Sequence, residues 1–571
     1  MDQTILERAK KWLHEPYDQH TRQETQALID AGGDNLTDAF YKDLDFGTGG
    51  MRGKMGPGTN RVNKYTLGAA TQGLCNYLHQ TFPNEELKVA IAHDSRHNSK
   101  AFAHQVAQVF AANEVKVFLY EELRPTPALS FAIRHLNCQS GIVITASHNP
   151  PEYNGYKVYW NDGGQLVPPH DKKVIEEVRK VQPKDVRFAS ESPLIESVGK
   201  ELDEAYLAEV QRQSFSNLGK EDLSVVFTSI HGTSITLVPP AMKNAGFTQV
   251  HLVEEQSEPN GDFPTVESPN PEEGEALSMA LALADEKQAD MVIGTDPDAD
   301  RVGIAVRNLD NQLELLNGNQ AASVLIYYLL EQWREKGLLT GKEFIGKTIV
   351  TTDLLAKIAE GYKVPCYECL TGFKWIADMI RKLEGKEKFI GGGEESYGYM
   401  VSHFVRDKDA VTSAVMLAEA AAHAKSEGSS FYKKLIEVYH KFGFYQEKLI
   451  SLKREGKKGA EEIAQMMEDF RSNTPAQIAG EPVTYVYDYQ QGARKNLLNG
   501  ETDAIDLPAS NVVQMVTERG TKITARPSGT EPKIKFYISV NAALDNKDQF
   551  IQVKQKLNAK IDEITKALNL G

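Results

Sequence analysis

A serine followed by a histidine opens the first of several segments whose residue types could take part in chemistry. The sequence TASHNPPEYNGYK occupies 145–157, directly after an apolar run. Ligands bind at the carboxyl ends of strands in α/β sheets, so Ser147 is expected at such an edge, held by Asn, Pro and Gly neighbours. A plain turn is the alternative interpretation. A Ser-His-Asp hydrolase is a poor match, because no G-x-S-x-G motif surrounds Ser147.

Three aspartates alternate along the second segment, GTDPDADR. Asp296, Asp298 and Asp300 follow an apolar strand at positions i, i+2 and i+4. A loop can turn three such carboxylates toward one point, and their mutual repulsion then requires a cation. Oxygen ligands of this kind suit Mg²⁺. An EF-hand is excluded because Arg301 stands where that loop needs Gly. A solvated acidic turn is the alternative interpretation.

Two glycine-rich segments favour recognition of hydroxyls and of an anion. The first is GGGEESYG at 391–398, where Glu394 and Ser396 can accept from and donate to vicinal sugar hydroxyls. The second is RPSGTEPK at 526–533, which offers a guanidinium, two hydroxyls and a Gly that frees backbone N–H groups. A plain Gly-rich loop and a hairpin turn are the respective alternatives.

A fifth segment, FGTGGMRG at 46–53, adds the cation Arg52 on what is expected to be a pliable loop. A Walker A motif is excluded, because no Gly-Lys-Ser/Thr follows. A dinucleotide-binding G-x-G-x-x-G motif is excluded as well, because no strand plainly precedes the glycines. Arg52 is therefore interpreted as an added positive charge for an anionic ligand.

Alternating strands and helices are expected to position these segments. Strands are predicted at 89–92, 115–120 and 141–145, with helices near 99–113 and 127–136, which is the length of β-α-β crossovers. The same alternation restarts twice, with strands expected at 223–227, 250–253 and 291–293, and then at 348–350 and 388–390. The pattern predicts three consecutive similar α/β domains.

The last part of the chain has a different pattern and predicts an α+β domain. Strands are expected at 512–517, 521–524 and 533–537, with helices near 459–471 and 546–568. The predicted domains are 1–205, 206–320, 321–445 and 446–571.

Composition restricts the location and the partners. The chain has 571 residues and a net charge of −15, from 64 basic and 79 acidic residues, so it lacks the basic surface typical of nucleic-acid or anionic-membrane binding. The longest apolar run, 321–330, is far shorter than the roughly 20 residues of a membrane span. The N-terminus lacks the apolar core of a signal peptide. Four cysteines do not make a disulfide framework, so a cytoplasmic location is predicted.

The first four segments, in this order, resemble the α-D-phosphohexomutase superfamily, and the resemblance covers nearly the whole chain. FGTGGMRG and the extended ASHNPPEYNGYKVY are most similar to the long phosphoglucomutase branch, which also contains phosphopentomutases. The resemblance implies four domains around a central cleft. It also implies a phosphomutase that interconverts glucose 1-phosphate and glucose 6-phosphate, with phosphopentomutase and phosphomannomutase activities as alternatives.

The resemblance also implies roles for residues. Ser147 would carry the phosphoryl group, and its phosphate and the three aspartates would hold Mg²⁺. Arg52 and Arg301 would neutralise charge on the transferring group. His148 and Lys157 are candidates for proton transfer, and Lys157 would need a pKa lowered by Mg²⁺ or Arg52. A simple phosphate-binding or strand-surface cation is the alternative role for Lys157.

A hexose 1,6-bisphosphate, the implied intermediate and activator, must turn around between two half-reactions. The residues implied to hold its sugar and its distal phosphate are Thr371, Gly372, Lys374, Glu394, Ser396, Lys408, Arg526, Ser528, Gly529 and Thr530. Sugar phosphates are thus the expected partners. A non-catalytic sugar-phosphate-binding protein conflicts with the intact serine, aspartates and arginine loop. A phosphatase, in which water replaces the sugar as acceptor, is a further alternative that closure of the cleft would exclude.

Overall fold

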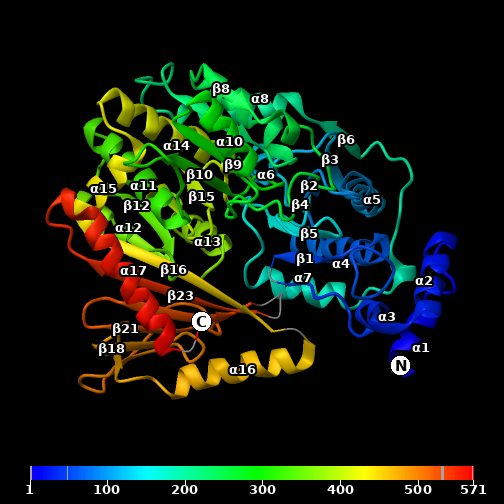
Figure 1. Cartoon of the computed structure of the whole chain (residues 1–571). Helices are drawn as coiled ribbons and strands as arrows, with labels where there is room; N and C mark the ends of the chain where they lie inside the picture. Colours follow the sequence, from blue (N-terminus) through cyan, green and yellow to red (C-terminus); the bar gives the residue numbers. More distant parts are fainter. Residues whose placement is uncertain (1–2, 48, 455, 529–532, 569, 571) are drawn as a thin grey trace.

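The computed structural model describes residues 3–47, 49–454, 456–528, 533–568 and 570 (Figure 1). At the N-terminus, α1 (Gln3–Lys11) packs with α2 (Gln19–Ala31) and α3 (Gly33–Phe40) around a small core that contains Trp12 and Tyr17. Within the described residues, none of the helices has the length and apolar character needed to cross a membrane.

The first α/β unit is a mixed sheet covered by helices on both faces. In sheet order its strands are β1 (Gly50–Lys54), β5 (Tyr153–Trp160), β4 (Ser140–Ile144), β2 (Lys88–His93), β3 (Lys116–Tyr120) and β6 (Ile195–Val198). Its helices are α4 (Lys64–Thr81), α5 (Ser99–Ala112), α6 (Thr126–His135) and α7 (His170–Val178). Val89 and Ile91 pack in one core cluster, Ala90 and Ala92 in another, so alternate residues of β2 fill both faces.

The second and third units repeat this architecture. In sheet order the second unit has β11 (Leu313–Leu315), β10 (Val302–Arg307), β9 (Met291–Thr295), β7 (Ser224–Thr228) and β8 (Gln249–Leu252), with α9 (Val238–Asn244) and α10 (Ser278–Lys287). The third has β13 (Cys366–Cys369), β12 (Glu343–Thr348), β14 (Lys388–Gly393) and β15 (Tyr399–Val401). Its helices are α11 (Gly318–Glu335), α12 (Leu354–Tyr362), α13 (Phe373–Leu383), α14 (Ala410–Ser426) and α15 (Phe431–Phe442).

A common strand order shows that the three units are alike. In each unit the first parallel strand lies between the second and the third, as β2 lies between β3 and β4. The equivalent centres are β7 and β12. In each unit an antiparallel strand then pairs with the outer side of the third: β5 with β4, β10 with β9, and β15 with β14. The prediction of three similar α/β domains is confirmed.

One predicted strand is misplaced. A strand was expected at 348–350, but β12 ends at Thr348, and Ile349 and Val350 lie in a turn. These two side chains are buried in a cluster with Tyr489 and Val512 of the C-terminal unit. Their apolar character therefore serves the contact between two units rather than the interior of a sheet.

The C-terminal unit is an antiparallel sheet with helices. In sheet order its strands are β16 (Phe444–Lys453), β23 (Lys533–Ala542), β22 (Lys522–Pro527), β21 (Val513–Thr517), β18 (Glu481–Asp488), β19 (Ala493–Asn496) and β20 (Thr502–Ala504), and β17 (Gln477–Ile478) pairs with β18. Its helices are α16 (Gly456–Ser472) and α17 (Phe550–Ala567). The predicted α+β character is confirmed, and Figure 1 shows this unit beside the third one.

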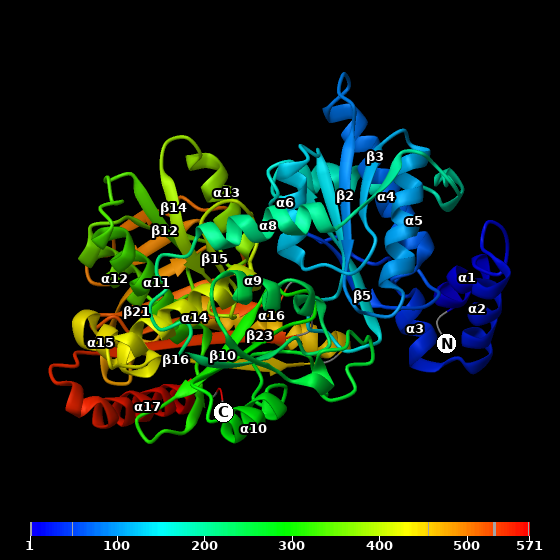
Figure 2. The same cartoon turned by 90° about the horizontal axis from the view of Figure 1, so that it is seen from above.

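Helix α8 (Lys200–Arg212) connects the first and second units and touches three of them. It packs against α6 of the first unit, α9 of the second and α14 of the third, and Figure 2 shows it crossing between them. Residue 205, one of the predicted domain limits, lies within α8. The limits near 320 and 445 lie near the starts of α11 and β16.

Candidate active site

The serine, aspartate and glutamate segments occupy the same place in three successive units. Each joins the third parallel strand to its antiparallel neighbour: residues 145–152 join β4 to β5, residues 296–301 join β9 to β10, and residues 394–398 join β14 to β15. The strand order alone therefore places these loops at equivalent sheet edges, where α/β proteins bind ligands.

Ser147 lies at the contact between the first two units. Its buried hydroxyl donates a 2.7 Å hydrogen bond to Oδ2 of Asp296 and lies 3.3 Å from Nδ1 of His148. The backbone of Ser147 is in the left-handed region, with φ of 53°. The buried guanidinium of Arg96 holds this conformation by donating to the carbonyl of Ser147 at 2.6 Å and to the carbonyl of Pro150 at 2.8 Å. The Ser147 side chain therefore points toward the aspartate loop.

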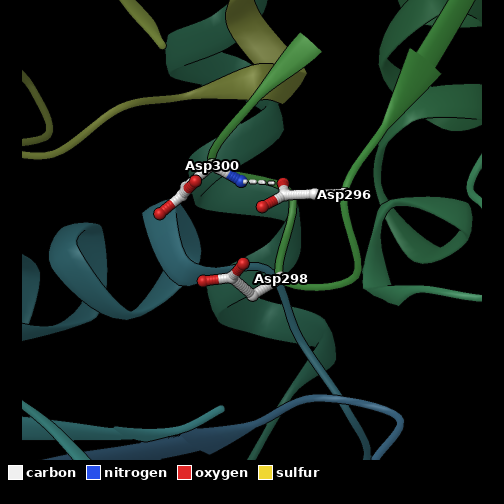
Figure 3. Close-up of side chains that lie close together, drawn as sticks. All are labelled: Asp296, Asp298 and Asp300. Atoms are coloured by element: carbon white, nitrogen blue, oxygen red, sulfur yellow. Dashed lines mark hydrogen bonds between the residues drawn. The ribbon is translucent and has the colours of Figure 1, made fainter. Parts of the chain in front are cut away.

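The three aspartates form a buried cluster suited to a cation. One carboxylate oxygen of each lies within 4.8 Å of the others, and all three side chains are buried. Figure 3 shows them on one turn, with the backbone N–H of Asp300 donating to Oδ1 of Asp296 at 3.1 Å. The Oδ1 atoms of Asp298 and Asp300 are buried and accept no hydrogen bond. Such oxygens keep their lone pairs available for a metal ion.

Positive side chains from two other units surround the cluster. Nζ of Lys157, on β5, lies 2.6 Å from Oδ2 of Asp298 and 3.0 Å from Oδ2 of Asp300. Nζ of Lys408, from the third unit, lies 3.0 Å from the same oxygen of Asp300. Arg301 pairs with Glu272, and its Nε lies 3.8 Å from Asp300. Three cationic side chains therefore face the three carboxylates, and Arg301 faces Glu272 as well.

These charges shift the pKa values of the site strongly. Burial, followed by Asp300 and Asp298, raises the pKa of Asp296 well above its usual range. Burial also raises the pKa of Asp300, but Lys157 and Lys408 outweigh it and hold that pKa well below normal. Burial lowers the pKa of Lys157, but Asp298 and Asp300 outweigh this effect and raise it. The protein's own carboxylates therefore raise the pKa of Lys157, and the lowering by Mg²⁺ or Arg52 that proton transfer would need stays a prediction.

His148 and Arg52 flank the serine. Burial, with Arg301 and Arg52 nearby, holds the pKa of His148 well below its usual value. Nη1 of Arg52 donates to Oδ1 of Asn149 at 2.9 Å. The loop expected around Arg52 is instead strand β1, which pairs antiparallel with β5 and sets Arg52 opposite Gly155. A Cβ atom at Gly155 would lie 2.7 Å from the carbonyl of Met51, so glycine permits this close pairing.

The third unit joins two of the predicted sugar-binding segments. The buried Glu394 accepts a 2.9 Å hydrogen bond at Oε1 from the backbone N–H of Gly372, at the start of α13. Oγ1 of Thr371 is buried without a hydrogen-bond partner, and Ser396 is half-buried on the loop of Glu394. Nζ of Lys374 lies 4.9 Å from the centre of the Trp375 ring, and burial lowers the pKa of this lysine.

The fourth predicted segment is described only in part. Arg526 lies at the end of β22 and Ser528 just beyond it, whereas Gly529 and Thr530 lie outside the described residues. Arg526 pairs across the sheet with Lys535 of β23. Burial and the neighbouring Glu394 raise the pKa of Glu395 to about 7, and Lys535 and Arg526 oppose that rise. The cations of the C-terminal unit therefore act on Glu395, in the loop 394–398 of the third unit.

Comparison with known proteins decides the family. Models described as phosphoglucomutase/phosphomannomutase, alpha/beta/alpha domains I, II and III match residues 43–185, 204–310 and 317–439. A phosphoglucomutase of Staphylococcus epidermidis is 39% identical over 523 residues, which cover 91% of this chain and 93% of that protein. The chain belongs to the phosphoglucomutase/phosphomannomutase family. The resemblance to the α-D-phosphohexomutase superfamily is thereby confirmed.

Solved structures share the fold of this phosphoglucomutase/phosphomannomutase chain. The open form of parafusin, a phosphoglucomutase of Paramecium, has a TM-score of 0.65 at 18% identity, covering 92% of this chain and 96% of its own. An N-acetylphosphoglucosamine mutase of Aspergillus fumigatus, in complex with GlcNAc-6P and magnesium, has a TM-score of 0.51 at 12% identity, covering 93% and 96%.

Sequence reasoning missed three residues of this phosphoglucomutase/phosphomannomutase site. Arg96 follows β2 in HDSRHNS, and polar residues at the carboxyl end of a parallel strand could have signalled it. Thr126, at the start of α6, donates to Oδ2 of Asp298 at 2.8 Å, and only the packing of two units reveals this contact. Lys535 could have been found from Lys533, the last residue of the fourth segment. Side chains two residues apart on a strand lie on the same face, so a strand that starts at Lys533 places Lys535 on the face of Lys533.

Proposed function

We propose that this protein is a phosphoglucomutase that interconverts glucose 1-phosphate and glucose 6-phosphate. A phosphoserine at Ser147 and a hexose 1,6-bisphosphate would be the intermediates. The observation that carries the proposal is the hydroxyl of Ser147 lying 2.7 Å from the buried aspartate cluster. The curated relatives named phosphoglucomutase support it at 38–39% identity. Family membership makes the chain an enzyme, an intramolecular phosphotransferase.

The residues present fit one Mg²⁺ ion per chain. Asp296, Asp298 and Asp300 would hold it together with the phosphate on Ser147, and the Oδ1 atoms of Asp298 and Asp300, which accept no hydrogen bond, support this arrangement. The magnesium in the Aspergillus mutase is consistent with the same choice of metal. When bound, the ion would act as a Lewis acid toward the phosphoryl oxygens.

The protein's own residues would then position the transfer. The phosphoryl group passes from Oγ of Ser147 to a sugar hydroxyl: the P–Oγ bond breaks, a new P–O bond forms, and the hydroxyl proton leaves to a base. His148, 3.3 Å from Oγ, and Lys157 are the two candidates for that proton. Arg52 and Arg301 would neutralise charge on the group in transit.

The distal phosphate needs a second anchor, because the bisphosphate must present each end to Ser147 in turn. Arg526, Ser528, Gly529 and Thr530 would hold this phosphate. The residues proposed to contact the sugar and its substituents are Thr371, Gly372, Lys374, Glu394, Ser396 and Lys408. The bond from Gly372 to Glu394 supports a joint surface for hydroxyls. We also propose that the chain divides into four domains, 1–205, 206–320, 321–445 and 446–571, arranged around one cleft. A cytoplasmic location remains a prediction.

A coupled assay with glucose, mannose and ribose 1-phosphates tests the substrate. We expect glucose 1-phosphate to have the highest kcat/KM. Preference for the ribose or mannose ester would instead make the protein a phosphopentomutase or phosphomannomutase that uses the same residues. Inorganic phosphate released in the same reactions distinguishes a phosphatase, and binding without turnover would identify a non-catalytic sugar-phosphate-binding protein.

A further inference from the structure

Two buried tyrosines hold the segment that carries Lys408. The hydroxyl of Tyr159, on β5 of the first unit, donates to Oδ2 of Asp407 at 2.6 Å. The hydroxyl of Tyr206, on α8, donates to Oδ1 of Asp409 at 2.7 Å. All four side chains are at most 1% exposed. Lys408 is thus flanked on both sides by carboxylates that are tied to other parts of the chain.

The backbone of the same segment is attached to all three α/β units. The N–H of Arg406 donates to Oγ of Ser130 in the first unit at 2.8 Å. The N–H of Asp409 donates to the carbonyl of Tyr399 in the third unit at 2.8 Å, and that of Ala410 to the carbonyl of Ala299 in the second at 3.2 Å. Residues 406–410 therefore form a junction between the three units. This junction contacts Ala299, which lies between Asp298 and Asp300 in the sequence.

The side chain of Lys408 extends from this junction to Asp300. A Cβ atom at Gly398 would lie 2.1 Å from Cδ of Lys408, so the lysine stem runs directly over a glycine. Its Nζ ends 3.0 Å from Oδ2 of Asp300 and 3.6 Å from Oδ1 of Asp407. A small rotation of the segment would move the ammonium away from the cluster, since a long side chain amplifies a change at its root.

The tyrosines are well suited to fix the segment. A buried carboxylate is costly unless hydrogen bonds satisfy it, so Asp407 and Asp409 favour the orientation in which their donors meet them. Asp407 also accepts from Nε2 of Gln165 at 2.9 Å. Burial and the adjacent carboxylates raise the pKa of Tyr159 and Tyr206 well above the usual value, which keeps both hydroxyls as donors.

We propose that Tyr159 and Tyr206 are positioning residues of the phosphoryl-transfer site: through Asp407 and Asp409 they set Lys408 against Asp300. This inference rests on the proposed function, in which Lys408 contacts the sugar phosphate. It gives two residues distant from the substrate a role in kcat. It also makes the angle between the first and third units a determinant of turnover.

The test compares Tyr159→Phe and Tyr206→Phe with the matched control Tyr328→Phe. Tyr328 is also buried and donates to a buried carboxylate, Glu419, at 2.9 Å within the third unit, and none of its hydrogen bonds to described residues reaches residues 406–410. We measure kcat and KM with hexose 1-phosphates and saturating glucose 1,6-bisphosphate, together with the melting temperature. The assay runs well below the lowest melting temperature, so that all variants are folded.

We expect kcat to fall about 10- to 100-fold in Tyr159→Phe and in Tyr206→Phe, with KM changed by less than about threefold, because misplacement by about 1 Å can have such an effect. Tyr328→Phe should lose melting temperature while keeping kcat. In a double-mutant cycle, Tyr159→Phe with Asp407→Asn should be non-additive, because the tyrosine acts through that carboxylate.

Unchanged kcat in both tyrosine variants would overturn the inference, as would equal loss of kcat in Tyr328→Phe. Lys408→Met separates this failure from that of the proposed function. If Lys408→Met keeps full turnover, the proposed role of Lys408 fails and the inference with it. If Lys408→Met loses turnover while the tyrosine variants keep it, only the inference fails.

Discussion

The hydroxyl of Ser147 donates a 2.7 Å hydrogen bond to Oδ2 of Asp296, a residue 149 positions further along the chain. The contact crosses from the first α/β unit to the second and joins two loops in equivalent places. Ser147 keeps this aim in a left-handed conformation, with φ of 53°, which Arg96 supports through the serine carbonyl. A strained residue held by a buried cation is typical of a position fixed for function.

Ser147→Ala is expected to abolish mutase turnover, because it removes the oxygen that would carry the phosphoryl group. Peptide mapping after incubation with glucose 1,6-bisphosphate should find phosphate on the peptide of Ser147 in the unmodified protein and none there in the variant. The exposed Ser451 provides the control: Ser451→Ala should keep both activity and phosphorylation. Near-normal turnover by Ser147→Ala would refute the assignment.

Asp298→Asn should lower kcat by about a hundredfold or more, since it replaces a charged metal ligand in a cluster that needs a cation. Fold stability should change little, because the substitution also relieves repulsion within the cluster. Chelation by EDTA should likewise remove activity, and added Mg²⁺ should restore it and raise the melting temperature. The exposed Asp310→Asn is the control. Full activity after chelation, without added metal, would contradict the metal site.

Arg526→Ala should raise KM for the sugar monophosphate about tenfold to a few hundredfold. The lost charge-assisted contact is worth roughly 1.5–3 kcal/mol, and about 1.4 kcal/mol is tenfold. The variant should also need more added bisphosphate, because the intermediate escapes before it turns around. Arg519→Ala, in the exposed turn that precedes β22, should leave both unchanged. An unchanged KM and bisphosphate requirement in Arg526→Ala would place the distal phosphate elsewhere.

Gly398→Ala is expected to lower kcat at least tenfold with little effect on binding, because its Cβ would lie 2.1 Å from Cδ of Lys408 and displace that side chain. Gly274 has open space where its Cβ would stand, so Gly274→Ala is the matched control and should behave like the unmodified enzyme. Steady-state kinetics of both variants measure the effect. Equal activity of the two would show that the position of Lys408 does not matter.

The buried carboxyl group of Glu447 should make the free energy of unfolding depend on pH. Burial, with Asp353 nearby, raises its pKa to about 7, above the value of an unfolded chain. The folded protein therefore binds this proton more tightly, and stability falls as the pH rises from about 4.5 through 7. Glu447→Gln removes this loss, so at pH 8 the free energy of unfolding of the variant should exceed that of the unmodified protein by about 1–2 kcal/mol, with a higher melting temperature. At pH 5 the two proteins should unfold at nearly the same temperature.

Thermal unfolding at the two pH values measures this difference. The exposed Glu518→Gln, in the same unit, should show no pH-dependent change relative to the unmodified protein. If the difference between Glu447→Gln and the unmodified protein were equal at pH 5 and pH 8, the proton would not belong to Glu447.

Local patterns in the sequence determined the chemical groups and the units that present them. Asp296, Asp298 and Asp300 are contiguous with an apolar strand, so their convergence on one loop followed from spacing alone. The alternation of strands and helices predicted the three α/β units, because side-chain burial on a two-faced sheet leaves a repeating pattern. The predicted strand at 348–350 shows the limit: Ile349 and Val350 have the same apolar signature whether a sheet or a neighbouring unit buries them.

Only the tertiary structure decided how these groups are paired. Lys157 and Lys408 share one oxygen of Asp300 although they come from the first and third units, and Arg96 supports a serine 51 residues away. The junction from Tyr159 to Asp407 spans 248 residues. Such pairings depend on how whole units pack. The sequence pattern around a charged or hydroxyl side chain does not indicate which distant residue it contacts. The sequence therefore determines which groups are available, and the packing of the units determines which of them meet.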